Sequence, residues 1–242
     1  MKIIAIIPAR ANSKRILNKN LLKINNVPLL KIIYQNLKKM KIFSKIVLST
    51  ESLKIKKLAQ NIGYDFIIDR PKKLSKDNTS TKDVIIHSIN NLEKKIRFSH
   101  VCCVYPMAIL FEKQDLLTGF KILKKKNDIV FPSLKFSHPI QRAFKIKKSQ
   151  VKYNLSDKQI SKNTQSFLEH FYDAGQFYIG QTYAWKNYKK SKKKSFSISA
   201  TRAVDVDNYD DLNILKVKYL LKKKLFNNFL NFFRYIVHFF EG

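Results

Sequence analysis

The chain has 242 residues, 45% of them hydrophobic, and 48 lysines and arginines against 17 aspartates and glutamates give a net charge of +31. This length and apolar content predict one globular domain with a substantial core and exclude an intrinsically disordered chain. The charge also suggests a nucleic-acid-binding module, because a basic surface concentrates polyanions. Lysine supplies almost all of the charge, in runs such as residues 124–126 and 192–194, so we favour a lysine-rich composition over a dedicated binding surface.

The two cysteines and the N-terminal segment indicate a cytoplasmic protein. Cys102 and Cys103 are adjacent within an apolar run, a spacing that suits neither a disulfide nor a zinc site. The apolar run before Pro8 is too short for a signal peptide, and no stretch has the length of a transmembrane helix.

Apolar segments alternate with helical patterns along the first 132 residues. We expect strands at residues 2–7, 45–49, 65–68, 100–105 and 128–132, and helices at residues 28–40, 52–62, 81–93 and 113–125. Gly63 stands where the second helix would need a C-cap. This alternation is typical of βαβ units and predicts an α/β fold, in which a doubly wound, mainly parallel sheet carries helices on both faces.

The alternation ends after residue 135. Residues 135–170 mix Pro, Ser, Lys and Asn without a clear period, which suits a small inserted subdomain or a dimerisation arm. Strands are expected again at residues 174–180 and 195–199, followed by an amphipathic helix over residues 209–223. We therefore expect one domain over residues 1–218.

A basic and aromatic amphipathic tail follows at residues 219–242. We favour its packing on the body or on a second subunit. The alternative is a peripheral contact with an acidic membrane surface, since basic amphipathic helices bind such surfaces.

A basic loop follows the first expected strand. Ligands of open α/β sheets bind beyond the carboxyl ends of the strands, and this loop offers Arg10, Ser13, Lys14, Arg15 and Lys19 there. Such a concentration of donors is what a triphosphate requires, although a similar loop can also be a solvated turn.

Two aspartates near the C-terminus form a second candidate site. If residues 204–207 are a strand, Asp205 and Asp207 share one side while Val204 and Val206 face the core. Two carboxylates suit Mg²⁺, which completes its shell with water and phosphate oxygens. The alternative is that Asp207 caps the following helix, with Asp210 in its first turn.

Three ordered motifs resemble those of the CMP-sialic acid synthetase (acylneuraminate cytidylyltransferase) family, to which CMP-KDO synthetases are more distantly related. They are IPARxxSKxxxxKN at residues 7–20, RPxxLSxD at residues 70–77 with a further aspartate at 83, and VDVD at residues 204–207. HPIQR at residues 138–142 and YDAGQFY at residues 172–178 most resemble one branch, the pseudaminic acid cytidylyltransferases. The resemblance extends to about residue 215 and implies a Rossmann-like nucleotidyltransferase fold.

This resemblance implies transfer of CMP from CTP to the anomeric hydroxyl of a nine-carbon 2-keto sugar acid, with release of pyrophosphate. Pseudaminic acid is the expected acceptor, and sialic acid, legionaminic acid and KDO are alternatives. Mg²⁺ or another divalent cation and a homodimer are expected. A nucleic-acid-binding module remains a distant alternative, and no specific nucleic-acid partner is expected.

The resemblance also implies a role for each motif residue. Arg10, Ser13, Lys14 and Lys19 would hold the CTP phosphates, Asn20 would lie near the ribose or base, and Arg70, Asp77, Thr79 and Ser80 would bind the cytosine side of the nucleotide. Arg10, Lys19 and Asp207 would be catalytic, and Asp205 and Asp207 would hold the metal. Tyr105, His138, Gln141, Arg142, Asp173 and Gln176 would select the sugar.

Several of these roles have alternatives, and the chain departs from the family at three places. Arg70 could instead form a structural salt bridge, His138 could be an ordinary loop residue, and Tyr178 is expected in the core with its neighbour at 177. Residues 11–12 replace a common Gly-Gly, residue 17 is leucine where proline is common, and residues 106–109 replace a more usual Ala-Thr-Ala-Pro. We expect the basic loop to follow a modified path at the first of these places.

Overall fold

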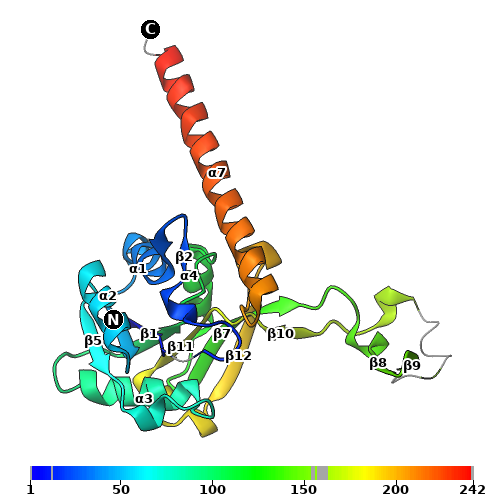
Figure 1. Ribbon diagram of the computed structural model, residues 1–242, viewed down its shortest axis with the longest axis horizontal. Helices are drawn as coiled ribbons and strands as arrows, with labels where there is room; N and C mark the ends of the chain where they lie inside the picture. Colours follow the sequence, from blue (N-terminus) through cyan, green and yellow to red (C-terminus); the bar gives the residue numbers. More distant parts are fainter. Residues whose placement is uncertain (1, 12, 154–155, 157–162, 241–242) are drawn as a thin grey trace.

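The computed structural model describes residues 2–11, 13–153, 156 and 163–240, with side chains as far as residue 225. An eight-stranded sheet forms its centre, in the order β10-β7-β11-β6-β1-β4-β5 with β12 paired to β7 (Figure 1). The strands are β1 (Ile3–Pro8), β4 (Lys45–Thr50), β5 (Phe66–Asp69), β6 (His100–Val104), β7 (Asp128–Lys135), β10 (Phe171–Asp173), β11 (Phe177–Gln181) and β12 (Lys192–Ser197).

Most neighbouring strands of this sheet are parallel. β1 pairs in parallel with β4 and β6, β4 pairs in parallel with β5, and β12 with β7. β10 and β11 run antiparallel to the strands they join. The predicted mainly parallel sheet is therefore confirmed.

Helices cover both faces of the sheet. They are α1 (Leu29–Met40), α2 (Leu53–Ile62), α3 (Thr81–Leu92), α4 (Lys113–Ile122), α6 (Thr182–Lys186) and α7 (Tyr209–Phe240). Ala5 and Ile7 of β1 pack in one core with α1, α2, α4 and the start of α7. Ile4 and Ile6, which point to the other face, pack with α3 and α6. The fold is thus doubly wound, as the sequence predicts.

The boundaries of α2 and α3 have recognisable causes. The Ser52 and Ser80 side chains accept hydrogen bonds from the backbone N–H groups of Ile55 and Asp83 in the first turns. Gly63 ends α2 with φ of 94°, and its N–H bonds to the carbonyl of Ala59, so the expected C-cap is confirmed.

Shorter elements connect these layers. They are the strands β2 (Lys23–Ile24) and β3 (Val27–Pro28) and the 3₁₀ turns Lys19–Leu21, Lys72–Leu74, Ile140–Arg142, Thr164–Ser166, Tyr188–Lys190 and Ala200–Arg202. The first of these turns follows the basic loop and directs the chain into the β2-β3 hairpin.

Residues 136–170, which we call the arm, leave the body between β7 and β10 (Figure 1). Their outer part is the antiparallel hairpin of β8 (Phe144–Lys147) and β9 (Gln150–Tyr153), and every residue of both strands is exposed. The expected irregular insertion is therefore partly a hairpin. Residues 154–155 and 157–162 lie outside the described residues.

Helix α7 runs beyond the predicted end at residue 223 and projects from the body (Figure 1). Its first turns are anchored: Leu212 and Leu215 are buried, Lys218 Nζ donates to the carbonyls of Ala200 and Ala203, and Lys222 Nζ donates to that of Leu110. The side chains from residue 226 onward, on which the expectation for the tail rests, are outside the described residues. Within the part of the chain that is described, no helix is both long and apolar enough to span a membrane.

Candidate active site

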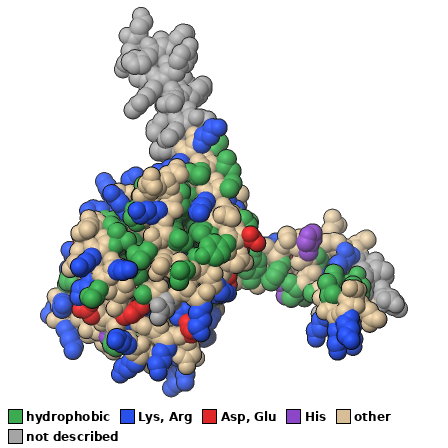
Figure 2. All heavy atoms as spheres, in the orientation of Figure 1, with side chains coloured by type: hydrophobic (Ala, Val, Ile, Leu, Met, Phe, Trp, Pro, Cys, Tyr) green, Lys and Arg blue, Asp and Glu red, His purple; other side chains and the backbone are tan. Residues whose placement is uncertain are grey.

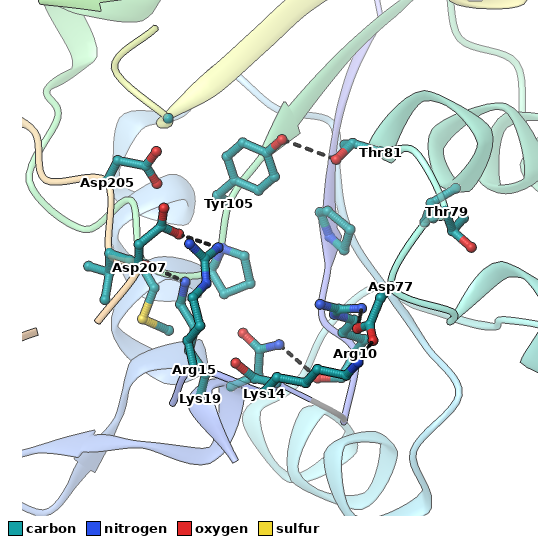
Figure 3. A pocket seen from close by; sticks show the side chains of 18 of the residues that line it. Arg10, Lys14, Arg15, Lys19, Asp77, Thr79, Thr81, Tyr105, Asp205 and Asp207 are labelled. Atoms are coloured by element: carbon teal, nitrogen blue, oxygen red, sulfur yellow. Dashed lines mark hydrogen bonds and ion pairs between the residues drawn. The ribbon is translucent and has the colours of Figure 1, made fainter. Parts of the chain in front are cut away.

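A cavity of about 700 Å³ lies at the carboxyl ends of β1, β5 and β6 (Figure 3). Most of the residues predicted to bind ligand line it, although they come from five separate parts of the sequence. These are Arg10, Ser13, Lys14, Lys19, Asn20, Arg70, Asp77, Thr79, Tyr105, Asp173, Asp205 and Asp207. The fold therefore brings together the predicted nucleotide residues except Ser80, both predicted metal residues and part of the predicted sugar set.

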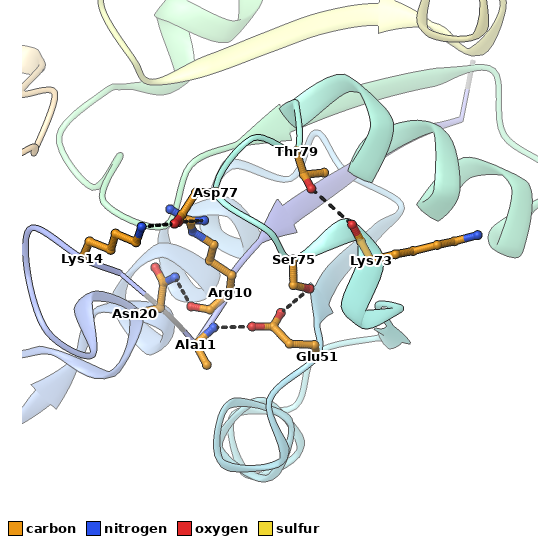
Figure 4. Close-up of polar contacts among 9 residues, drawn as sticks. All are labelled: Arg10, Ala11, Lys14, Asn20, Glu51, Lys73, Ser75, Asp77 and Thr79. Atoms are coloured by element: carbon orange, nitrogen blue, oxygen red, sulfur yellow. Dashed lines mark hydrogen bonds and ion pairs between the residues drawn. The ribbon is translucent and has the colours of Figure 1, made fainter.

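On one side of the cavity, Asp77 lies between two cations of the basic loop (Figures 3 and 4). Its carboxylate oxygens are 2.9 Å from Arg10 Nη1 and 2.7 Å from Lys14 Nζ. The hydrogen bond and charge of Lys14, together with those of Arg10, lower the pKa of Asp77. The Asp77 carboxylate thus lies between two cations, a position that would also suit a phosphate group.

On the opposite side, two more cations of the basic loop meet the C-terminal aspartates (Figure 3). Arg15 Nη2 is 2.7 Å from Asp207 Oδ1, and Lys19 Nζ donates to the carbonyl of Val206. Burial lowers the pKa of Lys19, while the charges of Asp207 and Asp205 oppose that shift. Partial desolvation raises the pKa of Asp205, and the neighbouring charge of Asp207 raises it further.

The segment that carries these aspartates is not a strand, contrary to our expectation. Residues 203–207 pair with none of the described strands, yet Val204 and Val206 are buried while Asp205 and Asp207 line the cavity. The segment passes over the core with alternate side chains pointing inward. The valines therefore face the core and the aspartates face the cavity, as predicted, although no sheet pairing fixes them.

The cap of α7 is also not the residue that we considered. The side chain of Asn208 accepts a hydrogen bond from the N–H of Asp211 at 2.9 Å. Asp211 Oδ2 in turn accepts from the N–H of Asn208 at 3.1 Å and from that of Asp207. This is a reciprocal capping pair, and it leaves the Asp207 carboxylate to the cavity.

The donor set fits a hard divalent cation that takes few protein ligands. Among the described residues no group of three or more His, Cys, Asp or Glu could hold a metal, so Asp205 and Asp207 stand as a pair. Gly175 lets the backbone approach this pair. Its φ is +62°, and a Cβ atom there would lie 2.8 Å from Asp205 Cγ.

Arg70 and Asn20 are buried and hold the walls of the cavity. Arg70 Nη2 donates to the carbonyl of Ser49 at 2.6 Å, and Arg70 forms none of the ion pairs found among the described residues. Burial lowers the pKa of Arg70, and the nearby Glu51 carboxylate opposes this effect. Asn20 Nδ2 donates to the carbonyl of Arg10 at 2.8 Å, which supports the basic loop from behind.

Five predicted residues do not line this cavity. Ser80 Oγ caps α3, and Gln176, 1% exposed, donates its amide to the carbonyls of Ala174 and Val204, so both side chains are used within the fold. His138, Gln141 and Arg142 lie on the arm, because the chain leaves the body after β7. There Gln141 contacts His170 at 3.2 Å, and the guanidinium of Arg142 lies over the ring of Phe167.

The cavity also contains Arg15 of the basic loop and Thr81, whose hydroxyl is 3.1 Å from that of Tyr105. We did not expect Tyr178 in it, and the hydroxyl of this residue bonds to Asp173. Tyr178 was expected in the core. Strand alternation could have identified it, since Phe177 faces the α4 side of the sheet and its neighbour must face the other way.

Known proteins resemble this chain along most of its length. The family model described as Cytidylyltransferase matches residues 4–226. Pseudaminic acid cytidylyltransferase of Campylobacter jejuni (serotype O:2) is 31% identical over 224 residues, covering 90% of this chain and 97% of that protein. The structure of CMP:2-keto-3-deoxy-manno-octonic acid synthetase complexed with CTP superposes with a TM-score of 0.68 at 16% identity, covering 93% of this chain and 100% of that one, which shows a shared fold. The chain therefore belongs to the cytidylyltransferase family of nucleotidyltransferases.

Proposed function

We propose that this enzyme transfers CMP from CTP to the anomeric hydroxyl of pseudaminic acid. The observation that carries the proposal is the pair of facing groups in one cavity, in which Arg10 and Lys14 stand opposite Asp205 and Asp207. A triphosphate needs the first group, and a divalent cation that bridges phosphates needs the second.

In this proposal the CTP phosphates displace Asp77 from Arg10 and Lys14. The sugar hydroxyl forms a bond to the α-phosphorus, the bond to the pyrophosphate oxygen breaks, and the hydroxyl proton passes to water. Lys19 and Arg15, held beside the aspartates, would stabilise the charge on the transferred phosphate. Catalysis then rests on positioning and charge and needs no covalent intermediate.

Asp205 and Asp207 would hold Mg²⁺ or another divalent cation. When bound, that ion would neutralise phosphate charge and orient the phosphates for in-line attack. Gly175 supports this role because it allows the Asp205 carboxylate to lie directly against the backbone.

The likeness to the Campylobacter jejuni protein, over 90% of this chain, supports pseudaminic acid as the acceptor. The sugar would bind near Tyr105, Asp173 and Tyr178, whose hydroxyl and carboxylate groups line one end of the cavity. The alternative most similar to this proposal is the same reaction with sialic acid, legionaminic acid or KDO as the acceptor.

The arm supports a homodimer. Isolated two-stranded hairpins are marginal in water, and this one exposes apolar side chains that a second subunit would cover. They include Phe144, Ile146, Val151 and Tyr153, and Leu168 is exposed elsewhere on the arm. If His138, Gln141 and Arg142 bind sugar, as the sequence predicts, they would do so in the cavity of the partner subunit.

Pyrophosphate release with CTP, Mg²⁺ and a panel of 2-keto sugar acids tests this function. We expect release with pseudaminic acid and none without a divalent cation. Release with only another acid would contradict the acceptor assignment, and no release with any would contradict the reaction.

The nucleic-acid alternative predicts salt-sensitive RNA or DNA binding without CTP turnover. Figure 2 disfavours it, because lysines and arginines are scattered over the visible face of the body.

A further inference from the structure

Glu51 joins two loops that border the cavity (Figure 4). It directly follows β4, and its Oε1 accepts a hydrogen bond from the backbone N–H of Ala11 at 2.7 Å. Its Oε2 accepts from Ser75 Oγ at 3.1 Å. A single carboxylate therefore ties the basic loop after β1 to the loop after β5 that carries Asp77.

Glu51 does this from outside the ligand cavity. It is absent from the lining of the cavity that holds Arg10 and Asp205, and it lines an adjacent hollow behind the two loops. The strand ends beneath it are already joined, since the N–H of Ala9 bonds to the carbonyl of Ser49 and that of Arg70 to the carbonyl of Thr50. The Glu51 hydrogen bonds connect the loops that follow these strands, where backbone pairing of the sheet has ended.

Among the described residues of these loops, the other side-chain links are of a different kind. They are the ion pairs of Asp77 with Arg10 and Lys14, which are solvent-accessible. Both cations belong to the group proposed to bind phosphate, so nucleotide binding would break both pairs. The Glu51 bonds involve no group proposed to bind the ligand, and they can persist in the nucleotide-bound state.

We propose that Glu51 is a positioning residue that keeps the phosphate-binding loop and the loop after β5 at a fixed spacing, and so sets the affinity for the nucleotide. This inference rests on the proposed CTP-binding function. It implies that loss of the bridge should weaken CTP binding while leaving the chemical step and the acceptor site largely unchanged, which is the signature of lost uniform binding.

Glu51→Ala and Glu51→Gln separate bridging from charge. Gln keeps one oxygen for the Ala11 N–H and supplies an amide donor for Ser75 Oγ, so it preserves the bridge without the charge. For Glu51→Ala we expect the KM and Kd for CTP to rise about ten-fold, with kcat and the acceptor KM within about three-fold of wild type. For Glu51→Gln we expect a CTP Kd within about two-fold of wild type.

Glu93→Ala is the matched control, because it removes a partly exposed glutamate whose partner, Lys186, is not part of the cavity. Ser75→Ala should raise the CTP Kd, and its effect should not add to that of Glu51→Ala. An unchanged CTP Kd in a folded Glu51→Ala protein, or equal defects in the Ala and Gln variants, would overturn the proposal. Calorimetric CTP binding by the wild type separates this result from a failure of the proposed reaction, because it needs no acceptor.

Discussion

Arg10 Nη1 lies 2.9 Å from Asp77 Oδ1, so a cation that is proposed to bind phosphate is already paired with a carboxylate of the protein. Lys14 meets the other oxygen of the same carboxylate at 2.7 Å. The sequence motif suggests that Asp77 contacts the nucleotide, whereas this geometry makes it a competitor of the triphosphate. The two roles predict opposite effects of one substitution.

Replacing Asp77 with Asn should lower the KM for CTP. The neutral amide pairs less strongly with Arg10 and Lys14, so the phosphates would displace a weaker partner. Because the pairs are solvent-accessible, we expect little change in thermal stability. CTP titrations at low and high salt measure the effect, which should shrink as salt screens it. A higher KM would instead assign Asp77 to direct nucleotide binding.

Replacing Asp207 with Asn should reduce turnover by at least about 100-fold, because the proposed metal loses a charged ligand. The fold should be retained, since Asn208 and Asp211 cap α7 without the Asp207 carboxylate. Circular dichroism and pyrophosphate release at increasing Mg²⁺ report the two effects. Asp210→Asn, in the exposed first turn of α7, is the control. Activity near wild type in the Asp207 variant would remove it from the metal site.

Replacing Gly175 with Ala should impair activity more than stability. The new Cβ would lie 2.8 Å from Asp205 Cγ, so the carboxylate must move. Gly63→Ala is a matched control, because Gly63 also has positive φ but its Cβ would meet nothing closer than 3.8 Å. Both variants should lose about 1 kcal/mol of unfolding free energy. Only Gly175→Ala should lose turnover, and equal turnover in the two would contradict a role for the close approach.

Replacing Ile146 with Asp should convert the proposed dimer into a monomer. Ile146 is 68% exposed on β8, and a charge there would oppose burial against a second hairpin. Light scattering after size exclusion measures the mass. Leu53→Asp, at an equally exposed leucine at the start of α2, controls for loss of an apolar residue. A wild-type protein that is monomeric at all concentrations would exclude the dimer.

Removal of residues 223–242 should leave turnover intact. Among the described residues, the hydrogen bonds and ion pairs of α7 with the body end at Lys222, which donates to the carbonyl of Leu110 and pairs with Glu112. Sedimentation with anionic liposomes then decides between the two expectations for the tail. Loss of liposome binding on truncation would assign it to the membrane surface, and unchanged sedimentation would leave packing or oligomer contact.

The central fold could be predicted because its middle strands, among them β1, β4 and β6, are buried on both faces and read as apolar runs. Residues 45–49 and 65–68 are within one residue of the observed β4 and β5. The hairpin of the arm was not predicted, although its strands FKIK and QVKY alternate apolar with polar residues. Each strand is only four residues long and lies in a lysine-rich segment, and neither has a buried face.

The residues that line the cavity could be predicted where they cluster in the sequence, as in the basic loop and the VDVD segment. They could not be predicted where a polar residue serves the fold instead. Gln176 and Ser80 carry the same side-chain groups as ligand-binding residues. In the fold, however, the Gln176 amide donates to two backbone carbonyls and the Ser80 hydroxyl caps α3. Sequence pattern does not distinguish these uses.

The bond from Lys19 to the carbonyl of Val206 spans 187 residues of sequence. A chain emerging from the ribosome would therefore complete its phosphate loop and most of its sheet long before the proposed metal-binding residues are synthesised. Assembly of the catalytic centre must be among the last steps of folding, because it requires closure of this long loop. Nascent or prematurely terminated chains that lack residues 204–207 could acquire the nucleotide-binding half of the site but not the other half.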